Sequence, residues 1–139
     1  MPRIFFNPLT GLYYRIIARR KPRRAPSTPE VERLRAQAKE TLPKRLEELA
    51  ARNGFKYNRV FIKNNVSNWG SCSAKGKINL NLRLVTLPEE LRDYVILHEL
   101  CHLKYLNHGK EFHALLETVC AGHRELAKRL KEYRITRPL

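Results

Sequence analysis

The sequence contains no long hydrophobic run and no internal repeat. Its uninterrupted apolar stretches are only a few residues long, whereas a membrane-spanning helix needs about 20 consecutive apolar residues. The first residues include Arg3 but neither an apolar segment of signal-peptide length nor a small-residue cleavage site. We therefore expect a cytoplasmic protein without a membrane partner, and its 139 residues suffice for one ordinary domain.

Cysteine is also scarce. The three cysteines, Cys72, Cys101 and Cys120, are odd in number and widely spaced. This pattern argues against a disulfide framework and against a zinc ribbon, which requires CxxC pairs. We expect all three to be buried thiols.

Acidic residues are few, with 13 Asp and Glu against 28 Lys and Arg, which gives a net charge of +15. Residues 1–26 contain no acidic side chain and are predicted to form a basic N-terminal arm. Such an arm suits nucleic-acid association, although no recognised nucleic-acid motif accompanies it and a solvated, flexible segment also explains the charge. Within it, weak alternation around Thr10-Gly11 predicts a short hairpin, with a helix over Leu12–Ala18 as the alternative.

Residues 27–139 are predicted to form the folded domain. A helix is expected to begin at Ser27 or Thr28, to end near Gly54 and to be kinked at Pro43. Its apolar residues recur at intervals of three and four positions, which places them on one face: Leu34, Ala38, Leu42, Leu46 and Leu49.

Three strands are expected after this helix. Alternating apolar and polar residues predict strands over Tyr57–Lys63 and Lys77–Val85, and a further strand is expected over Trp69–Ser73. Lys75-Gly76 supplies a turn between the last two strands.

The remaining segments are predicted to be helical. Thr86–Glu89 has the form of a capping box, with a hydroxyl at the cap and a carboxylate three residues on, so a helix is expected from Leu87 to about Leu106. Two further helices are expected, one from about Phe112 that breaks near Gly122, and one over His123–Tyr133. Because helices and strands do not alternate, the expected class is α+β with a small, mostly antiparallel sheet.

The segment H-E-L-C-H, residues 98–102, contains the candidate metal ligands and the candidate general base. His98 and His102 lie four residues apart, so a helix presents both imidazoles on one face to a single metal ion. Glu99 lies beside the first ligand, where a general base would take a proton from metal-bound water. A catalytic zinc site needs a third protein ligand, for which His108 is the leading candidate and His113 the competitor.

A chance HExxH on a solvated helix is the alternative interpretation. The surrounding residues weaken it, because they are apolar on most of the circumference: Val95, Ile96, Leu97, Leu100, Leu103 and Leu106. Buried charged and polar groups need partners, and three of the five histidines fall within eleven positions of one another around a carboxylate. A metal explains this grouping and core packing does not.

The run over residues 68–117, from NWGSCSAKGKINLNL to HGKEFHALLE, resembles the central block of the YgjP-like metallopeptidase family, which is related to SprT-like zinc proteases. The resemblance implies a minimal zincin fold in which Trp69–Ser73 and Ile78–Leu84 pack on the HExxH active-site helix. It also implies a set of functional residues: His98, His102 and His108 as zinc ligands, and Glu99 as the catalytic acid/base.

This chain departs from the family pattern at three positions near the site. The family commonly has Arg before its W-G-S-C segment, where this chain has Asn68. It has Ser in its H-S-K-x-F segment and Trp after the Phe, where this chain has Gly109 and His113. These departures concern substrate preference more than metal binding.

The sequence therefore predicts a zinc-dependent metallopeptidase that hydrolyses peptide or protein substrates through a zinc-activated water. Trp69, Gly70 and Ser71 are candidate substrate-binding residues, because an edge strand binds an extended peptide by strand addition, although Trp69 also suits the core. Asn79 and other sheet side chains are candidates for orienting the ligand histidines. Two alternatives stay open: a metal-dependent nucleoside triphosphate pyrophosphatase and a DNA-associated protease.

Overall fold

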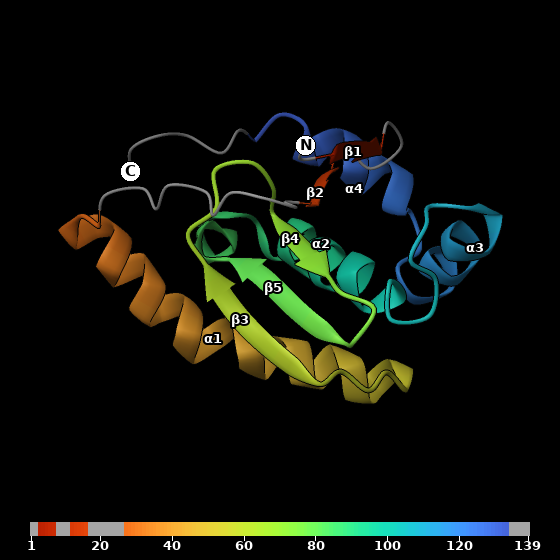
Figure 1. Ribbon diagram of the computed structural model, residues 1–139, viewed down its shortest axis with the longest axis horizontal. Coiled ribbons are helices and arrows are strands. Elements are labelled where there is room, and N and C mark those ends of the chain that lie inside the picture. The colour runs from red at the N-terminus through yellow and green to blue at the C-terminus, as the bar shows by residue number, and fades with distance from the viewer. Residues whose placement is uncertain (1–2, 8–11, 17–26, 134–139) are drawn as a thin grey trace.

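The structure is a computed structural model that describes residues 3–7, 12–16 and 27–133 (Figure 1). A long helix is followed by a three-stranded sheet and then by three shorter helices, which confirms the α+β class. The elements in chain order are β1 (Arg3–Asn7), β2 (Leu12–Ile16), α1 (Pro29–Asn53), β3 (Arg59–Lys63), β4 (Gly70–Cys72), β5 (Lys77–Asn81), the 3₁₀ helix η1 (Leu82–Thr86), α2 (Glu89–Cys101), α3 (Lys110–Val119) and α4 (His123–Leu130).

Helix α1 begins and ends where its sequence predicts. The hydroxyl of Thr28 accepts a hydrogen bond from the backbone N–H of Val31 at 3.2 Å, which caps the first turn. Gly54 ends the helix with φ of +72°, a conformation that glycine adopts at low cost. The helix continues through Pro43. Four of the five predicted stripe residues are buried and Leu34 is partly buried, and the complete buried set is Val31, Ala38, Leu42, Leu46, Leu49 and Ala50.

The sheet has the order β3-β5-β4, with β5 in the centre. Strands β4 and β5 form the predicted antiparallel pair, joined by a turn in which Gly76 has φ of +83°. Strand β3 pairs with β5 in parallel, so the sheet is mixed rather than mostly antiparallel. Alternation along a strand reports which face is buried but not the direction of its neighbour, so the sequence could not distinguish these pairings.

The predicted strand over Lys77–Val85 is shorter in the structure. It ends at Asn81, whose side-chain oxygen accepts the backbone N–H of Arg83 at 3.0 Å and starts the 3₁₀ helix η1. Leu82 and Leu84 are still fully buried, so their burial produced the alternating pattern without a strand.

The predicted capping box at Thr86–Glu89 is also wrong. The hydroxyl of Thr86 donates backward to the carbonyl oxygen of Arg83 at 2.6 Å, so it caps no helix. Helix α2 begins at Glu89 after Pro88 without a side-chain cap, and it ends at Cys101 rather than near Leu106.

Helices α1 and α2 contact one another and both contact the sheet, so that α2 lies behind β4 and β5 in Figure 1. Helices α3 and α4 both pack against α2. Helix α3 begins two residues before the predicted start near Phe112 and ends at Val119, before the predicted break near Gly122. Helix α4 ends at Leu130, three residues before the predicted end at Tyr133. Their apolar contribution to the core consists of Phe112, Leu116, Ala127 and Leu130.

At the N-terminus, β1 and β2 form an antiparallel hairpin in which Phe5 pairs with Tyr14. The hairpin interpretation is therefore confirmed over the alternative helix. The other residues of the predicted basic arm, including the run over residues 17–26, lie outside the described residues. No helix in the described part of the chain is long and apolar enough to cross a membrane.

Candidate metal centre

Three histidines converge at the end of α2. His98 and His102 lie one helical turn apart, and the chain then turns back so that His108 faces them. Each histidine offers one ring nitrogen, and these three atoms all lie within 4.8 Å of one another. His98 and His102 are buried and His108 is partly buried. The structure thus brings the three sequence candidates together and places His113, the competitor, outside the group.

The ring of Phe112 packs against all three histidines. Its centroid lies 5.0 Å from that of His98, 4.5 Å from that of His102 and 5.0 Å from that of His108. Phe112 itself is fully buried, so it supplies an apolar wall beside the ring nitrogens.

This apolar setting keeps the imidazoles neutral. Burial lowers the pKa of His98 well below its usual value and also lowers the pKa of His102. For His108, burial and then the neighbouring His102 and His98 lower the pKa to about 3. A neutral imidazole is the form that binds a metal ion, so the three side chains are in the ligating state at neutral pH.

The orientation of His102 is fixed by the backbone. Its Nδ1 lies 2.9 Å from the carbonyl oxygen of Tyr105, and because a carbonyl only accepts, Nδ1–H is the donor. The lone pair of the neutral ring is then on Nε2, which is the arrangement typical of a metal-ligating histidine. Sequence reasoning missed this contact, since a backbone carbonyl leaves no signal in the identity of residue 105.

The sheet side chains that were candidates for this role bond within the sheet and its preceding loop. The side-chain amide of Asn79 donates to the hydroxyl of Ser71 at 3.0 Å. The hydroxyl of Ser73 accepts from the backbone N–H of Lys77 at 3.1 Å. These hydrogen bonds brace the β4–β5 hairpin.

Glu99 lies beside the histidines in the interior. Its carboxylate is fully buried, and its Oε2 is 3.6 Å from Nδ1 of His98. Burial raises the pKa of Glu99 to about 7, although the neighbouring His102 opposes this rise. A carboxylate with a pKa near 7 is suited to accept and return a proton at neutral pH.

Strand β4 passes directly against Glu99. A Cβ atom on Gly70 would lie 3.1 Å from Cγ of Glu99, 3.2 Å from its Oε2 and 3.1 Å from the backbone oxygen of Asn79. Carbon atoms pack at about 3.5–4.0 Å, so a side chain at position 70 would fit only if its neighbours moved by a few tenths of an ångström. Of the candidate substrate-binding residues, Gly70 lies beside Glu99 and Ser71 is partly buried, whereas Trp69 is a core residue with 7% of its surface exposed.

A buried polar network holds the loop that leads into β4. The side-chain amide of Asn81 donates to the backbone oxygens of Asn65 and Asn68 at 2.8 and 2.9 Å. The guanidinium of Arg83, 3% exposed, donates to the side chain of Asn64 at 2.7 Å and to the backbone oxygen of Asn65 at 2.9 Å. This network fixes the approach of β4 to Glu99, and sequence reasoning did not find it.

The donor set fits a metal ion with an open position. Among the described residues, His98, His102 and His108 form the group whose ligand atoms lie close enough to hold a metal ion. Burial raises the pKa of both Cys72 and Cys101 to about 12, so these thiols are protonated at neutral pH and are poor ligands. Three histidines without a fourth protein ligand are typical of a catalytic site, whereas structural zinc sites use four.

A small α+β domain whose HExxH helix and following turn assemble three histidines around a buried glutamate has the character of a metallopeptidase. The chain belongs to the YgjP-like family, since residues 19–133 match the metallopeptidase domain of that family.

Two solved structures have the same fold. The metallopeptidase zymogen abylysin of Pyrococcus abyssi is 26% identical, with a TM-score of 0.60 over 69% of this chain and 100% of that chain. The metallopeptidase zymogen jannalysin of Methanocaldococcus jannaschii is also 26% identical, with a TM-score of 0.57 over 65% of this chain and 93% of that chain. No sequence among the curated proteins matches this chain.

Proposed function

We propose that this protein is a zinc-dependent peptidase whose ligands are His98, His102 and His108 and whose general base is Glu99. The observation that carries the proposal is the convergence of three neutral histidines beside a buried carboxylate with a pKa of about 7. A zinc ion held by these three histidines would supply Lewis acidity for the hydrolysis of a peptide bond.

Three side chains around the metal centre have separate roles in the proposed reaction. Glu99 accepts the proton of the attacking water and returns it to the leaving amine, so that it is a base in the first step and an acid in the second. His102 keeps its ligating nitrogen in place through its hydrogen bond to Tyr105. Phe112 limits the access of water around the histidines through its packing against all three rings.

Strand β4 is the proposed binding surface for the peptide. It is an edge strand of the sheet, and Gly70 brings its backbone against Glu99. An extended peptide that adds to this edge would pass its backbone beside the base, with main-chain hydrogen bonds for affinity. Trp69 supports the strand from the core, and Ser71 remains a candidate contact.

The test is hydrolysis of casein and of short peptides by the zinc-loaded protein and by Glu99→Gln. The variant keeps the shape of the side chain but not its basicity, so we expect turnover to fall by at least about 100-fold with the metal retained. An active Glu99→Gln protein would rule out the assigned base. Nucleoside triphosphates in the same assay test phosphoanhydride hydrolysis, which we rank second because the family and both structural relatives are peptidases.

We also propose that the protein is cytoplasmic and that its basic arm binds nucleic acid. A cytoplasmic enzyme with an electropositive arm over residues 1–26 would associate with nucleic acid and act on proteins held there. The net charge of +15 supports this extension, which is independent of the chemistry at the metal centre.

A further inference from the structure

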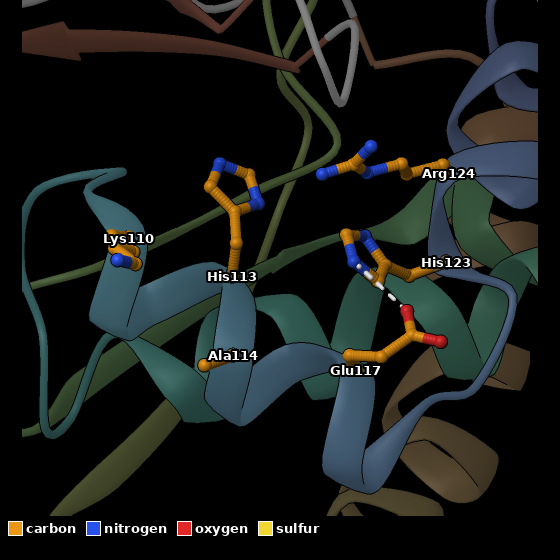
Figure 2. A pocket seen from close by; sticks show the side chains of 6 residues that line it. All are labelled: Lys110, His113, Ala114, Glu117, His123 and Arg124. Carbon is orange, nitrogen blue, oxygen red and sulfur yellow. Dashed lines mark ion pairs between the residues drawn. The ribbon is translucent and has the colours of Figure 1, made fainter.

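A second cluster of titratable side chains lies between α3 and α4 (Figure 2). It lines a pocket of about 540 Å³, which we call the α3–α4 pocket. Helix α3 contributes four of the lining residues and α4 contributes two: Lys110, His113, Ala114 and Glu117, then His123 and Arg124. None of these residues belongs to the metal centre.

The pocket contains buried polar atoms whose hydrogen-bonding capacity is unused. Both ring nitrogens of His113 and the Nδ1 of His123 are buried and have no hydrogen-bond partner within the described residues. His123 is only 2% exposed, and the two rings stack with centroids 5.8 Å apart and planes 18° apart. A neutral imidazole carries one N–H, and leaving a buried donor unpaired is costly, so the ring N–H of His113 indicates an acceptor ligand in the pocket.

The charges around these nitrogens favour an anion. The side chain of Arg124 reaches from α4 toward His113, and Lys110 lies across the pocket (Figure 2). Neither cation forms an ion pair with any residue that the structure describes. Glu117 is already engaged, since its carboxylate lies 3.2 Å from Nε2 of His123 and accepts the N–H of Gly122 at 3.4 Å.

A divalent cation suits the pocket less well. Lys110 and Arg124, which have no ion-pair partner among the described residues, line it and would repel a metal ion. Among the described residues, His113, His123 and Glu117 also do not form a group that could hold a metal ion.

The pocket adjoins the metal centre. The ring centroid of Phe112 lies 4.5 Å from that of His102, on which it stacks, and 5.4 Å from that of His113. The ring of Phe112 thus contacts both the metal centre and the pocket. Because each residue of an extended peptide spans about 3.3 Å, a substrate side chain within a few residues of the scissile bond can extend to the pocket.

We propose that the α3–α4 pocket is a specificity site that binds a carboxylate of the peptide substrate, with Arg124 and Lys110 supplying charge and His113 a ring N–H. The inference rests on the proposed peptidase function and adds a substrate class, namely peptides with an anionic group at a fixed distance from the cleaved bond. That carboxylate is either an acidic side chain or the peptide C-terminus. A guanidinium binds a carboxylate through paired hydrogen bonds, which makes Arg124 the main determinant.

The test measures peptide binding without turnover. Fluorescein-labelled peptides with one Glu or Gln at each successive position are titrated against zinc-loaded Glu99→Gln protein by anisotropy, at fixed salt. We expect Glu to bind about tenfold more tightly than Gln at one position only, the gain of a charge-assisted hydrogen bond. Adding Arg124→Gln should abolish this preference. The matched control, Lys128→Gln, removes one charge from the same helix outside the pocket and should retain it.

Further peptides distinguish a side-chain carboxylate from the C-terminal carboxylate, and zinc analysis tests whether the pocket binds a metal ion instead. A preference that follows a free rather than an amidated C-terminus assigns the pocket to the terminal carboxylate, and a preference that follows Glu assigns it to a side chain. The proposal is overturned if Glu and Gln bind equally at every position and free and amidated C-termini also bind equally. Equal loss of binding in the Arg124 and Lys128 variants overturns it as well. A second equivalent of zinc that is lost on His113→Ala overturns it in favour of a metal site.

Hydrolysis of the same peptides by the wild-type protein tests the peptidase proposal separately from the carboxylate-binding proposal. Cleavage without a positional preference refutes the specificity pocket alone. A preference that depends on Arg124, without any cleavage, refutes the peptidase proposal and leaves a carboxylate-binding pocket.

Discussion

The substitution Gly70→Ala adds one methyl group at the closest approach between β4 and the proposed base. The new Cβ would lie 3.1 Å from Cγ of Glu99 and 3.1 Å from the backbone oxygen of Asn79, so the overlap is about 0.4 Å against ordinary contact distances. Strand β5 is hydrogen-bonded on both sides and resists displacement. The strain therefore falls on Glu99.

Two magnitudes follow for Gly70→Ala. Overpacking of a filled interior costs about 1–3 kcal/mol in the free energy of unfolding. A displacement of about 1 Å in a reacting group costs on the order of 100-fold in rate, so the smaller shift here should lower kcat/KM about tenfold. The three histidines are untouched, so zinc content should not change. Urea unfolding, peptide hydrolysis and elemental analysis on one preparation measure all three quantities.

The matched control is Gly109→Ala. Gly109 has φ of −81°, and a Cβ there meets no atom within 4 Å. Its cost should be at most about 1 kcal/mol, the difference between glycine and alanine at a helix N-cap. If Gly70→Ala matched this control in both stability and turnover, then the contact with Glu99 would not position the base and our account of β4 would be wrong.

The remaining predictions concern the polar network and the basic arm. We expect Asn81→Ala to destabilise the protein by about 1–3 kcal/mol in urea, because the buried backbone oxygen of Asn68 loses the donor that Asn81 supplies and that of Asn65 keeps only Arg83. The partly buried Asn79→Ala should cost less, and equal costs would show that the network does not hold the loop. We expect the full chain to retard DNA in a mobility-shift assay at low salt and to release it as the salt concentration rises. A chain without residues 1–26 should bind DNA more weakly. If the full chain does not retard DNA at low salt, the nucleic-acid proposal is wrong.

The sequence predicted the convergence of His98, His102 and His108 because its signals are local. The spacing of His98 and His102 is a property of any helix, and the Asn107-His108-Gly109 stop predicted that the chain would turn back after it. The caps of α1 at Thr28 and Gly54 are local for the same reason.

The features that sequence reasoning missed depend on contacts between distant segments or on backbone atoms. The parallel pairing of β3 with β5 and the contact of Gly70 with Glu99 join residues far apart in the chain. The carbonyl of Tyr105 that orients His102 carries no side-chain signal. After β5, Leu82 and Leu84 are both buried although they lie in a 3₁₀ helix. Their apolar side chains two positions apart continued the alternating sequence pattern, which therefore predicted a longer strand.

The most direct test of the central claim is the zinc content of the purified wild-type protein, of His102→Ala and of His113→Ala. The account predicts one equivalent of zinc in the wild type, its loss in His102→Ala and its retention in His113→Ala, which lies outside the three-histidine group. Absence of zinc from the wild type even after titration, or retention of zinc by His102→Ala, would contradict the assignment of the metal centre.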